Sequence, residues 1–328
     1  MTRLAVIGAG LAGLVVARAL QRDHDVTGFE KSRGTGGRMA TRYEKGYEFD
    51  HGAQFFTART QEFQGYLQPL LERGIVANWR ACFAEVNQAG VLNARQWNDH
   101  NPHYVGAPRM NAVGKSLGED LNISLNTTVA RLEPCRGGWL LADSNETPLG
   151  RFDWVILAMP AAQAAALAPE LSALRQHACS VNMRACIAVM LGFEAPLSLP
   201  WQAALVQGAD ISWVSANNSK PGRPDGFTLV VHSTNAYADA HIDDSMDAVS
   251  SHLLSEIADM IGVDGECADV CRLHRWRYAN VDSQDGEDCF IDSTARLAAC
   301  GDWFRRGRIE SAFLSGFSLA RKLSSRLR

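Results

Sequence analysis

The sequence lacks the marks of several protein classes. None of its eight cysteines forms a Cys-x-x-Cys pair, and no Cys/His pair follows Cys267 and Cys271 at the spacing of a zinc site. We therefore expect reduced thiols, no disulfide framework and no metal site. The uncharged stretch 154–169 contains Pro160 and is shorter than the about 20 residues that a membrane helix needs. The sequence thus predicts a cytoplasmic protein without a membrane span.

An excess of positive charge is also absent. The chain has 32 Lys and Arg residues against 36 Asp and Glu, and the two signs are mixed along it. We therefore expect no broad cationic face for nucleic acid. Hydrophobic residues make up 46% and charged residues 21%, the balance of an ordinary globular protein. At 328 residues the chain suits two domains of roughly 150 residues each, as a monomer or weak homodimer.

A nucleotide-binding motif begins almost at the first residue. Residues 4–7 form an apolar strand, and Gly8, Gly10 and Gly13 follow it at the start of a segment with helical apolar spacing. Residues 25–30 then form a second strand that ends on an acid, Glu30. Strand, glycine turn, helix, strand and acid within about 30 residues are the fingerprint of a dinucleotide-binding βαβ unit. A purely structural βαβ unit is the alternative.

Each of these residues has a chemical role in such a unit. Gly8 permits the tight turn, Gly10 lets the backbone approach a pyrophosphate, and Gly13 lets the helix pack close to the strand. The phosphates then lie at the helix N-terminus. Glu30 would accept hydrogen bonds from ribose hydroxyls and repel a 2′-phosphate. The motif therefore predicts an adenine dinucleotide.

Two further glycine elements indicate which dinucleotide is bound. Gly36 and Gly37 precede Arg38 just after the acid, and they bring backbone amides and a guanidinium to a diphosphate. Near the other end of the chain, Gly301 and Asp302 follow a short apolar strand. Taken alone, this pair is equally typical of an ordinary turn.

Together these motifs resemble those of the amine-oxidase-like flavoprotein superfamily. Within it the chain is most similar to the renalase family, particularly the shorter bacterial form, in residues 49–57, 108–112, 301–304 and 310–316. The resemblance implies noncovalent FAD, held from both ends of the chain. The residues that it assigns to the cofactor are Gly8, Gly10, Leu11, Ala12, Gly13, Glu30, Lys31, Gly37, Arg38, Met39, Ala53, Gln54, Phe55, Val129, Asp302, Ile309 and Ala312.

The resemblance also implies an activity. Renalase-like enzymes oxidise the 1,2- or 1,6-dihydro isomers of NAD(P)H to NAD(P)+ by hydride transfer to flavin N5, and O2 then reoxidises the flavin and gives H2O2. No catalytic side chain is assigned, because such a transfer needs positioning rather than a nucleophile or metal. No second glycine motif opens a βαβ unit after residue 40, so the substrate would lie in a cavity over the flavin. The alternatives are an amine oxidase or carotenoid-type desaturase, and a noncatalytic binding or escort protein.

The substrate residues are predicted less directly. Residues 54–59 follow the expected flavin contact, and Arg95 and Trp97 pair a cation with a stacking surface. His51 has two interpretations, covalent flavin attachment or a buried, hydrogen-bonded side chain, and the second is favoured. His232 in the later block is expected to be structural. The candidate substrate residues are Phe56, Thr57, Ala58, Arg59, Arg95, Gln96, Trp97, Arg184, Trp213 and His241, each weighed against a loop or core role.

The fold that follows is of the α/β class. We expect a discontinuous Rossmann-type FAD-binding domain, residues 1–60, 103–170 and 290–328. The second, α+β substrate domain would comprise residues 61–102 and 171–289 and contain a mostly antiparallel sheet. The supporting segments are strands at 124–132, 138–142, 152–160, 186–193, 211–214 and 227–232, a helix at 246–261 and a closing helix from about residue 310.

Overall fold

A six-stranded sheet is built from both ends of the chain in the computed structural model, which describes residues 1–327. Its central strand β1 pairs in parallel with β2 on one side and β13 on the other, and β13 pairs in parallel with β20. The apolar run before Pro160 therefore returns to this sheet, as expected. The strands, in spatial order, are β19 (Phe290–Asp292), β20 (Leu297–Ala299), β13 (Trp154–Leu157), β1 (Arg3–Ile7), β2 (Asp25–Phe29) and β9 (Ile123–Ser124).

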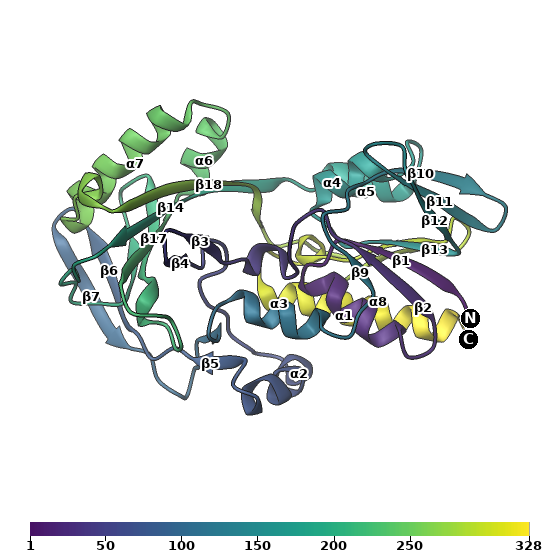
Figure 1. Cartoon of the computed structure of the whole chain (residues 1–328), viewed down its shortest axis with the longest axis horizontal. Coiled ribbons are helices and arrows are strands. Elements are labelled where there is room, and N and C mark those ends of the chain that lie inside the picture. The colour runs from purple at the N-terminus through teal and green to yellow at the C-terminus, as the bar shows by residue number, and fades with distance from the viewer. Residues whose placement is uncertain (328) are drawn as a thin grey trace.

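Helices cover one face of this sheet, and helices with a β-meander cover the other (Figure 1). Helices α1 (Leu11–Leu20) and α8 (Ile309–Arg326) pack on the first face, where Val6 and Ile156 lie in the same core as Leu319. A Cβ at Gly316 would lie 2.5 Å from the Ala12 carbonyl oxygen, so glycine lets these two helices approach. The opposite face is covered by α4 (Ala161–Leu167), α5 (Ala173–Ser180), β10 (Val129–Cys135), β11 (Gly138–Asp143) and β12 (Pro148–Phe152).

A second sheet of seven strands forms the other lobe. Its pairs are antiparallel except β15 with β6, and α6 and α7 cover one of its faces. Helix α7 has the predicted bounds and begins where the Ser245 hydroxyl accepts a hydrogen bond from the Ala248 amide. The elements are β18 (Val270–Val281), β14 (Met183–Phe193), β17 (Phe227–Ser233), β16 (Ile211–Ala216), β15 (Ala203–Val206), β6 (Cys82–Asn87), β7 (Gly90–Gln96), α6 (Asn235–His241) and α7 (Met246–Ile261).

Short elements connect the two lobes. They are β3 (Arg42–Glu44), β4 (Tyr47–Phe49), α2 (Gln61–Glu72), β5 (Val76–Asn78), β8 (Tyr104–Gly106) and α3 (Asn111–Gly118). The 3-10 turns are η1 (Gly37–Met39) between β2 and β3, η2 (Asn217–Ser219) and η3 (Gly265–Cys267) in the second lobe, and η4 (Asp302–Phe304) between β20 and α8. Among residues 1–327, no helix is long and apolar enough to cross a membrane.

The α/β fold class is confirmed, and one predicted strand is wrong. Residues 124–132 are divided between β9 in the six-stranded sheet and β10 in the meander. Between them Asn126 adopts φ 53°, a left-handed conformation that ends a strand and that Asn tolerates better than most residues. The domain bounds stay a prediction, and their last residue, 328, lies outside the described part of the chain.

Candidate functional site

The first glycine turn closes tightly between β1 and α1. Gly8 has φ 104°, and a Cβ there would lie 2.5 Å from the Ala158 carbonyl oxygen on the neighbouring strand's end. A Cβ at Gly13 would overlap the Gly8 carbonyl oxygen, which explains the close packing of helix on turn. Gly10 has open space instead and caps α1 without a side-chain hydrogen bond. The free amides of the first helical turn can therefore bind an anion.

Glu30 follows the end of β2 and is held by backbone amides. Its Oε2 accepts a hydrogen bond from the Ala9 amide at 2.8 Å, and its Oε1 accepts one from the Ser32 amide at 2.9 Å. The side chain is buried, and it lines a cavity. Each carboxylate oxygen keeps a further lone pair, so the fixed carboxylate can also accept from hydroxyl groups of a ligand.

The second glycine turn packs on the first one. The Gly36 amide donates to the Ala9 carbonyl at 2.8 Å, and Gly37 adopts φ 55° beside Gly10. Arg38 then donates from Nη1 and Nη2 to the two Asp302 carboxylate oxygens, at 2.9 and 2.5 Å. This pair joins the two ends of the chain. We expected the Arg38 guanidinium to face a diphosphate, but here it is paired with a protein carboxylate.

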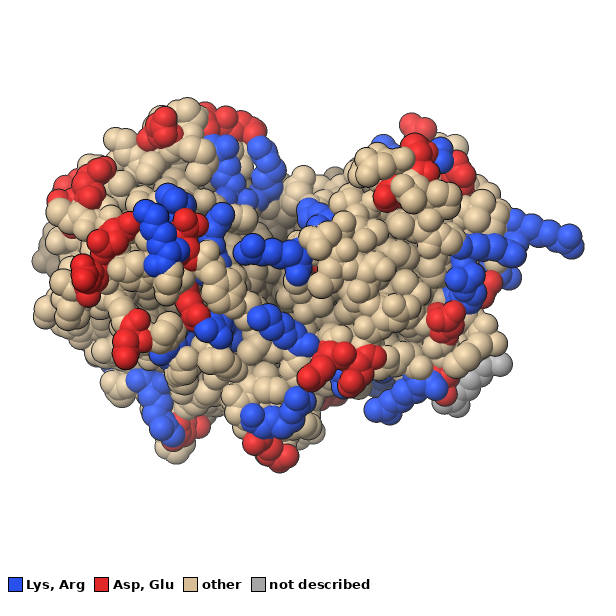
Figure 2. All heavy atoms as spheres, viewed as in Figure 1, with Lys and Arg blue, Asp and Glu red and all other residues tan. Residues whose placement is uncertain are grey.

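These turns open into one large cavity between the two lobes, with a volume of about 1750 Å³. Figure 2 shows Lys and Arg side chains gathered around the hollow. All the predicted cofactor residues line it except Gly13, which lies behind the turn. Pockets for one drug-sized ligand measure roughly 300–1,000 Å³, so this cavity has room for more than one such molecule. A separate cavity of about 470 Å³, beside residues 193–199, is remote from the glycine turns.

The N-terminus of α8 also faces the cavity, through Ile309 and Ala312. The adjacent Glu310 uses its Oε1 to accept from the Arg59 amide, the Thr60 amide and the Thr60 hydroxyl, at 3.0, 2.7 and 2.8 Å. Glu310 therefore fixes the 59–60 segment. The positive end of the α8 dipole favours negative charge on a group bound in front of it.

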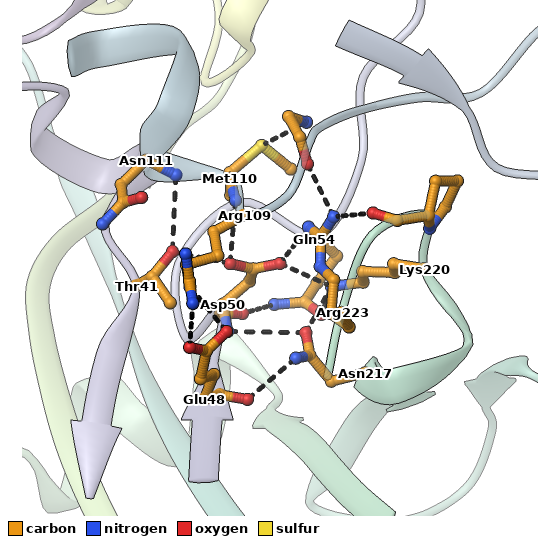
Figure 3. Close-up of polar contacts among 12 residues, drawn as sticks. Thr41, Glu48, Asp50, Gln54, Arg109, Met110, Asn111, Asn217, Lys220 and Arg223 are labelled. Carbon is orange, nitrogen blue, oxygen red and sulfur yellow. Dashed lines mark hydrogen bonds and ion pairs between the residues drawn. The ribbon is translucent and has the colours of Figure 1, made fainter. Parts of the chain in front are cut away.

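A buried polar network lies behind the turn at residues 50–54 (Figure 3). Its centre is Asp50, whose carboxylate accepts from the Thr41 hydroxyl at 2.7 Å and the Met110 amide at 3.0 Å, and pairs with Arg223. Lys220 Nζ lies 3.7 Å from the same carboxylate. These residues come from both lobes, so the network, called the Asp50 network below, fixes the turn relative to the second sheet.

Gln54 is fully occupied by this network. Its Oε1 accepts from Ser215 Oγ at 2.8 Å and Lys220 Nζ at 3.0 Å. Its Nε2 donates to the carbonyl oxygens of Asp50 and Gly52, at 2.5 and 2.9 Å. A side-chain amide has two donors and two acceptor sites, and all four are used here. Gln54 borders the cavity but its amide has no free group for a cofactor.

The charges of the Asp50 network shift the pKa values of its members. Burial alone would raise the pKa of Asp50, but Lys220 and Arg223 together lower it. Burial lowers the pKa of Lys220 from 10.5 to about 7, and Arg223 adds to this effect while Asp50 opposes it. Lys220 is the surplus cation, because Arg223 already pairs with the single carboxylate.

Aromatic and imidazole rings form the wall on the side of the second sheet. His51 stacks on Trp276 at 5.1 Å and meets His274 edge to face at 4.8 Å. Burial is the main cause that lowers the pKa of His51 to about 3, and those of His232 and His274 to about 4. These imidazoles are therefore neutral at pH 7. His51 is buried as expected, but its Nδ1 has no hydrogen-bond partner among the described residues.

The predicted substrate residues divide into two groups. Phe56, Thr57, Arg59 and Trp213 line the cavity. Ala58 does not, and buried Trp97 lies one layer behind, stacked on His103 at 3.7 Å and packed on Phe55.

The other four predicted substrate residues have structural partners outside the cavity, which corrects their assignment. Arg95 lies over the Phe83 ring, and Gln96 Nε2 donates to the Arg80 carbonyl at 2.7 Å. Arg184 pairs with Asp239, and His241 Nδ1 lies 2.7 Å from an Asp244 oxygen. Arg184, Gln96 and His241 therefore have protein partners, Arg95 packs on a ring, and none of the four lines the cavity.

β3, β18 and the loop before α8 also contribute to the cavity wall, although none of them was predicted to do so. These segments place His274, Trp276, Tyr278, Arg42, Arg275, Arg277 and Arg308 on the cavity wall. The alternation of Arg275 and Arg277 with aromatic residues was a usable signal, because period 2 puts the two arginines on one face of a strand. Nothing local indicated that this strand borders the cavity.

Two family models match the chain. The model described as "NAD(P)-binding Rossmann-like domain" matches residues 6–71, and the model described as "Flavin containing amine oxidoreductase" matches residues 82–324. Among curated proteins, renalase of Mus musculus is 22% identical over 350 residues, which cover 98% of this chain and 99% of the relative. A Staphylococcus aureus 4,4'-diapophytoene desaturase is 36% identical over 77 residues, 20% of this chain and 15% of the relative.

Solved structures share the fold over the whole chain. A putative protoporphyrinogen oxidase from Exiguobacterium superposes with a TM-score of 0.80 at 13% identity, covering 99% of each chain. Cyclohexylamine oxidase from Brevibacterium oxydans gives a TM-score of 0.74 at 13% identity, and a putrescine oxidase variant gives 0.72 at 14%, both covering 99% of each chain. At these identities the likeness concerns the fold alone.

Proposed function

The chain belongs to the family of flavin-containing amine oxidoreductases, and we propose that it oxidises isomeric dihydronicotinamide dinucleotides. The substrates would be 1,2- and/or 1,6-dihydro-NAD(P), and the products NAD(P)+ and, with O2 as acceptor, H2O2. The cofactor is FAD. The full-length match to a renalase supports the substrate class, and the charge of the cavity carries the proposal.

The cavity wall is strongly cationic although the chain has a net charge of -4. Nine Lys and Arg side chains line it against three carboxylates, those of Glu30, Asp302 and Glu310. One of the nine, Arg277, also pairs with the Asp243 carboxylate outside the lining, so five cations are in excess. The phosphates of FAD carry one negative charge each, so they balance only part of this surplus. A second anionic ligand is therefore favoured, and a dinucleotide brings its own diphosphate. The nine cations are Lys31, Arg33, Arg38, Arg42, Arg59, Lys115, Arg275, Arg277 and Arg308.

The same surplus opposes the alternative substrates. A simple amine is protonated at neutral pH and would enter against like charges. A desaturase substrate is a hydrocarbon, and it would have to bury charged side chains next to apolar surface. The fold shared with cyclohexylamine and putrescine oxidases keeps amine oxidation as the second candidate. A noncatalytic binding protein is the third.

The residues present fit FAD. The glycine turns leave a cradle that a Cβ at Gly8 or Gly37 would disturb, and Glu30 is fixed beside it. In our proposal Gly10, Leu11 and Ala12 hold the diphosphate and the α8 N-terminus lies at the ring end. Bound FAD supplies the two-electron acceptor, so the protein contributes position rather than a nucleophile.

The opposite wall suits a nicotinamide ring. Trp213 and Trp276 offer flat aromatic faces, and the neutral His232 and His274 offer hydrogen bonds without adding charge. Oxidation makes the nicotinamide ring cationic, and neutral imidazoles oppose that change less than protonated ones would. These side chains would also exclude water from the contact between the two rings.

Anaerobic mixing of the purified holoprotein tests the proposal. Borohydride-reduced NAD+, which contains the dihydro isomers, should bleach the flavin absorbance rapidly, whereas putrescine and cyclohexylamine should not. Bleaching by amines alone would favour the second candidate. A colourless protein that binds no added FAD would remove both enzyme candidates.

A further inference from the structure

We infer that Arg275 and Arg277, on the cavity-facing edge strand β18, form the subsite for the diphosphate of the second dinucleotide. This inference rests on the proposed function and adds where the substrate's phosphates bind. Both side chains line the cavity, and neither belongs to the glycine turns that hold FAD.

The position of β18 lets one ligand contact both of its faces. β18 is the edge strand of the seven-stranded sheet, so its outer side borders the cavity. Trp276 points to the 51–54 turn, where its Nε1 donates to the His51 carbonyl at 3.0 Å. Arg275 lies opposite Ile187, which belongs to the core under α6 and α7, so it is on the other face. A dinucleotide whose nicotinamide lies beside Trp276 would cross this edge towards the arginines.

The turn between α6 and α7 holds both guanidinium groups. Arg275 Nη2 donates to the Asp244 carbonyl, and Arg277 pairs with the Asp243 carboxylate. The two arginines are two residues apart on one face of the strand, so both can reach a single diphosphate. They are held in position before a ligand binds, which reduces the conformational entropy lost on binding.

Arg275 has unused capacity for an anion. Its one hydrogen-bond partner among residues 1–327 is a neutral carbonyl oxygen, and no carboxylate of these residues lies within 4.0 Å of it. Its Nε is buried and has no hydrogen-bond partner in the described chain. A ligand cannot reach this buried atom, but Nη1 also has no hydrogen-bond partner in the described chain and is not buried, so it can donate to a phosphate oxygen in the cavity. Arg275 thus has a guanidinium charge without a carboxylate within 4.0 Å and an accessible unpaired Nη1, and these two observations favour an anionic ligand at this point.

The opposite wall can receive the rest of the molecule. Helix α4 lines the same cavity with Gln163, Ala166 and Leu167. Ala166 and Leu167 offer apolar surface to a nucleoside base, and Gln163 offers hydrogen bonds. The ligand class recognised here is therefore a nucleoside diphosphate joined to a second nucleoside.

Binding to the FAD-loaded protein tests the subsite directly. Isothermal titration with ADP-ribose, NAD+ and nicotinamide would compare wild type with Arg275→Gln and Arg277→Gln. Arg272→Gln is the matched control, because Arg272 is on the same strand, pairs with Glu44 and does not line the cavity. A hydrogen bond to a charged group corresponds to roughly 10- to 100-fold in affinity, so each cavity variant should bind ADP-ribose and NAD+ at least about tenfold more weakly. Nicotinamide binding should stay unchanged.

The results separate the subsite from the proposed function. If Arg275→Gln and Arg277→Gln bind ADP-ribose as tightly as wild type and Arg272→Gln do, the subsite is wrong, even if the dihydro isomers bleach the flavin. If the isomers fail to bleach wild type while the arginine variants still lose ADP-ribose, the proposed reaction is wrong and the diphosphate subsite stands. In the active enzyme, loss of either arginine should raise KM and leave kcat nearly unchanged, because these arginines contact a part of the substrate far from the reacting ring.

Discussion

Replacing Lys220 by Met should change how the stability of the holoprotein depends on pH. Lys220 is completely buried, and its ammonium bonds to Gln54 Oε1 at 3.0 Å and Asn217 Oδ1 at 2.9 Å. Asp50 already pairs with Arg223, so protonated Lys220 adds a net positive charge to a dry site. Burial is the main cause that lowers its pKa from 10.5 to about 7.

The sign and size of the effect follow from proton linkage. Below pH 7 both the native and the unfolded chain carry the proton. Between pH 7 and 10.5 the unfolded chain binds a proton that the native protein has released, so the free energy of unfolding rises with pH. Each pKa unit corresponds to about 1.4 kcal/mol, so wild type should gain about 2 to 3 kcal/mol between pH 7 and 9 from this residue alone. Lys220→Met should lack this gain.

Urea unfolding of the FAD-loaded proteins at pH 6, 7, 8 and 9, with free FAD held constant, measures the difference. Lys45→Met is the control, because Lys45 is exposed in the turn between β3 and β4. It should follow wild type at every pH. Parallel pH profiles for wild type and Lys220→Met would show that the native pKa of Lys220 is not lowered, and would refute the reasoning.

Three other substitutions test the site. Asp50→Asn leaves Lys220 and Arg223 buried without a carboxylate. Urea titrations at pH 7 should show a free energy of unfolding that is lower by about 3–5 kcal/mol. A loss no larger than that of the exposed control Asp225→Asn would contradict this prediction. Gly13→Ala forces a Cβ onto the Gly8 carbonyl and should abolish FAD retention during purification, whereas Gly34→Ala, which meets nothing within 4 Å, should keep it. Arg38→Lys loses the two-point pairing with Asp302 and should weaken FAD binding by about tenfold or more in fluorescence titrations; unchanged affinity would mean that this pair does not position the cofactor.

The nucleotide end of the site could be predicted because its signals are local. Gly8 needs a positive φ, Gly13 lies against the turn that it follows, and Glu30 ends the next strand, so about 30 consecutive residues determine the geometry. The distant Asp302 was placed only through a family resemblance. Its pairing with Arg38 joins residues 264 positions apart, and no periodicity encodes such a contact.

The substrate end could not be predicted in the same way. Arg95, Gln96 and Trp97 form a local cluster that suggests recognition, but β7 turns Arg95 and Gln96 outward and Trp97 packs behind the wall. Arg275 and Trp276 line the cavity because β18 is an edge strand, which depends on the order of seven strands from distant parts of the chain. Strand order of this kind is a tertiary property, and composition and spacing do not report it.

The net charge of the chain and the local charge of the cavity also differ, and only the net charge can be read from the sequence. A net charge of -4 with mixed signs predicts no broad cationic face, but a net charge averages over the whole surface. Folding brings cations from β3, β18, the 30–38 segment and the loop before α8 to one cavity, while most acids remain elsewhere. A low-dielectric cavity focuses that local surplus on whatever enters it. The affinity for a charged ligand therefore depends on the charges that line the cavity rather than on the net charge of the chain. In our proposal this is why a protein with a negative net charge binds a polyanionic substrate.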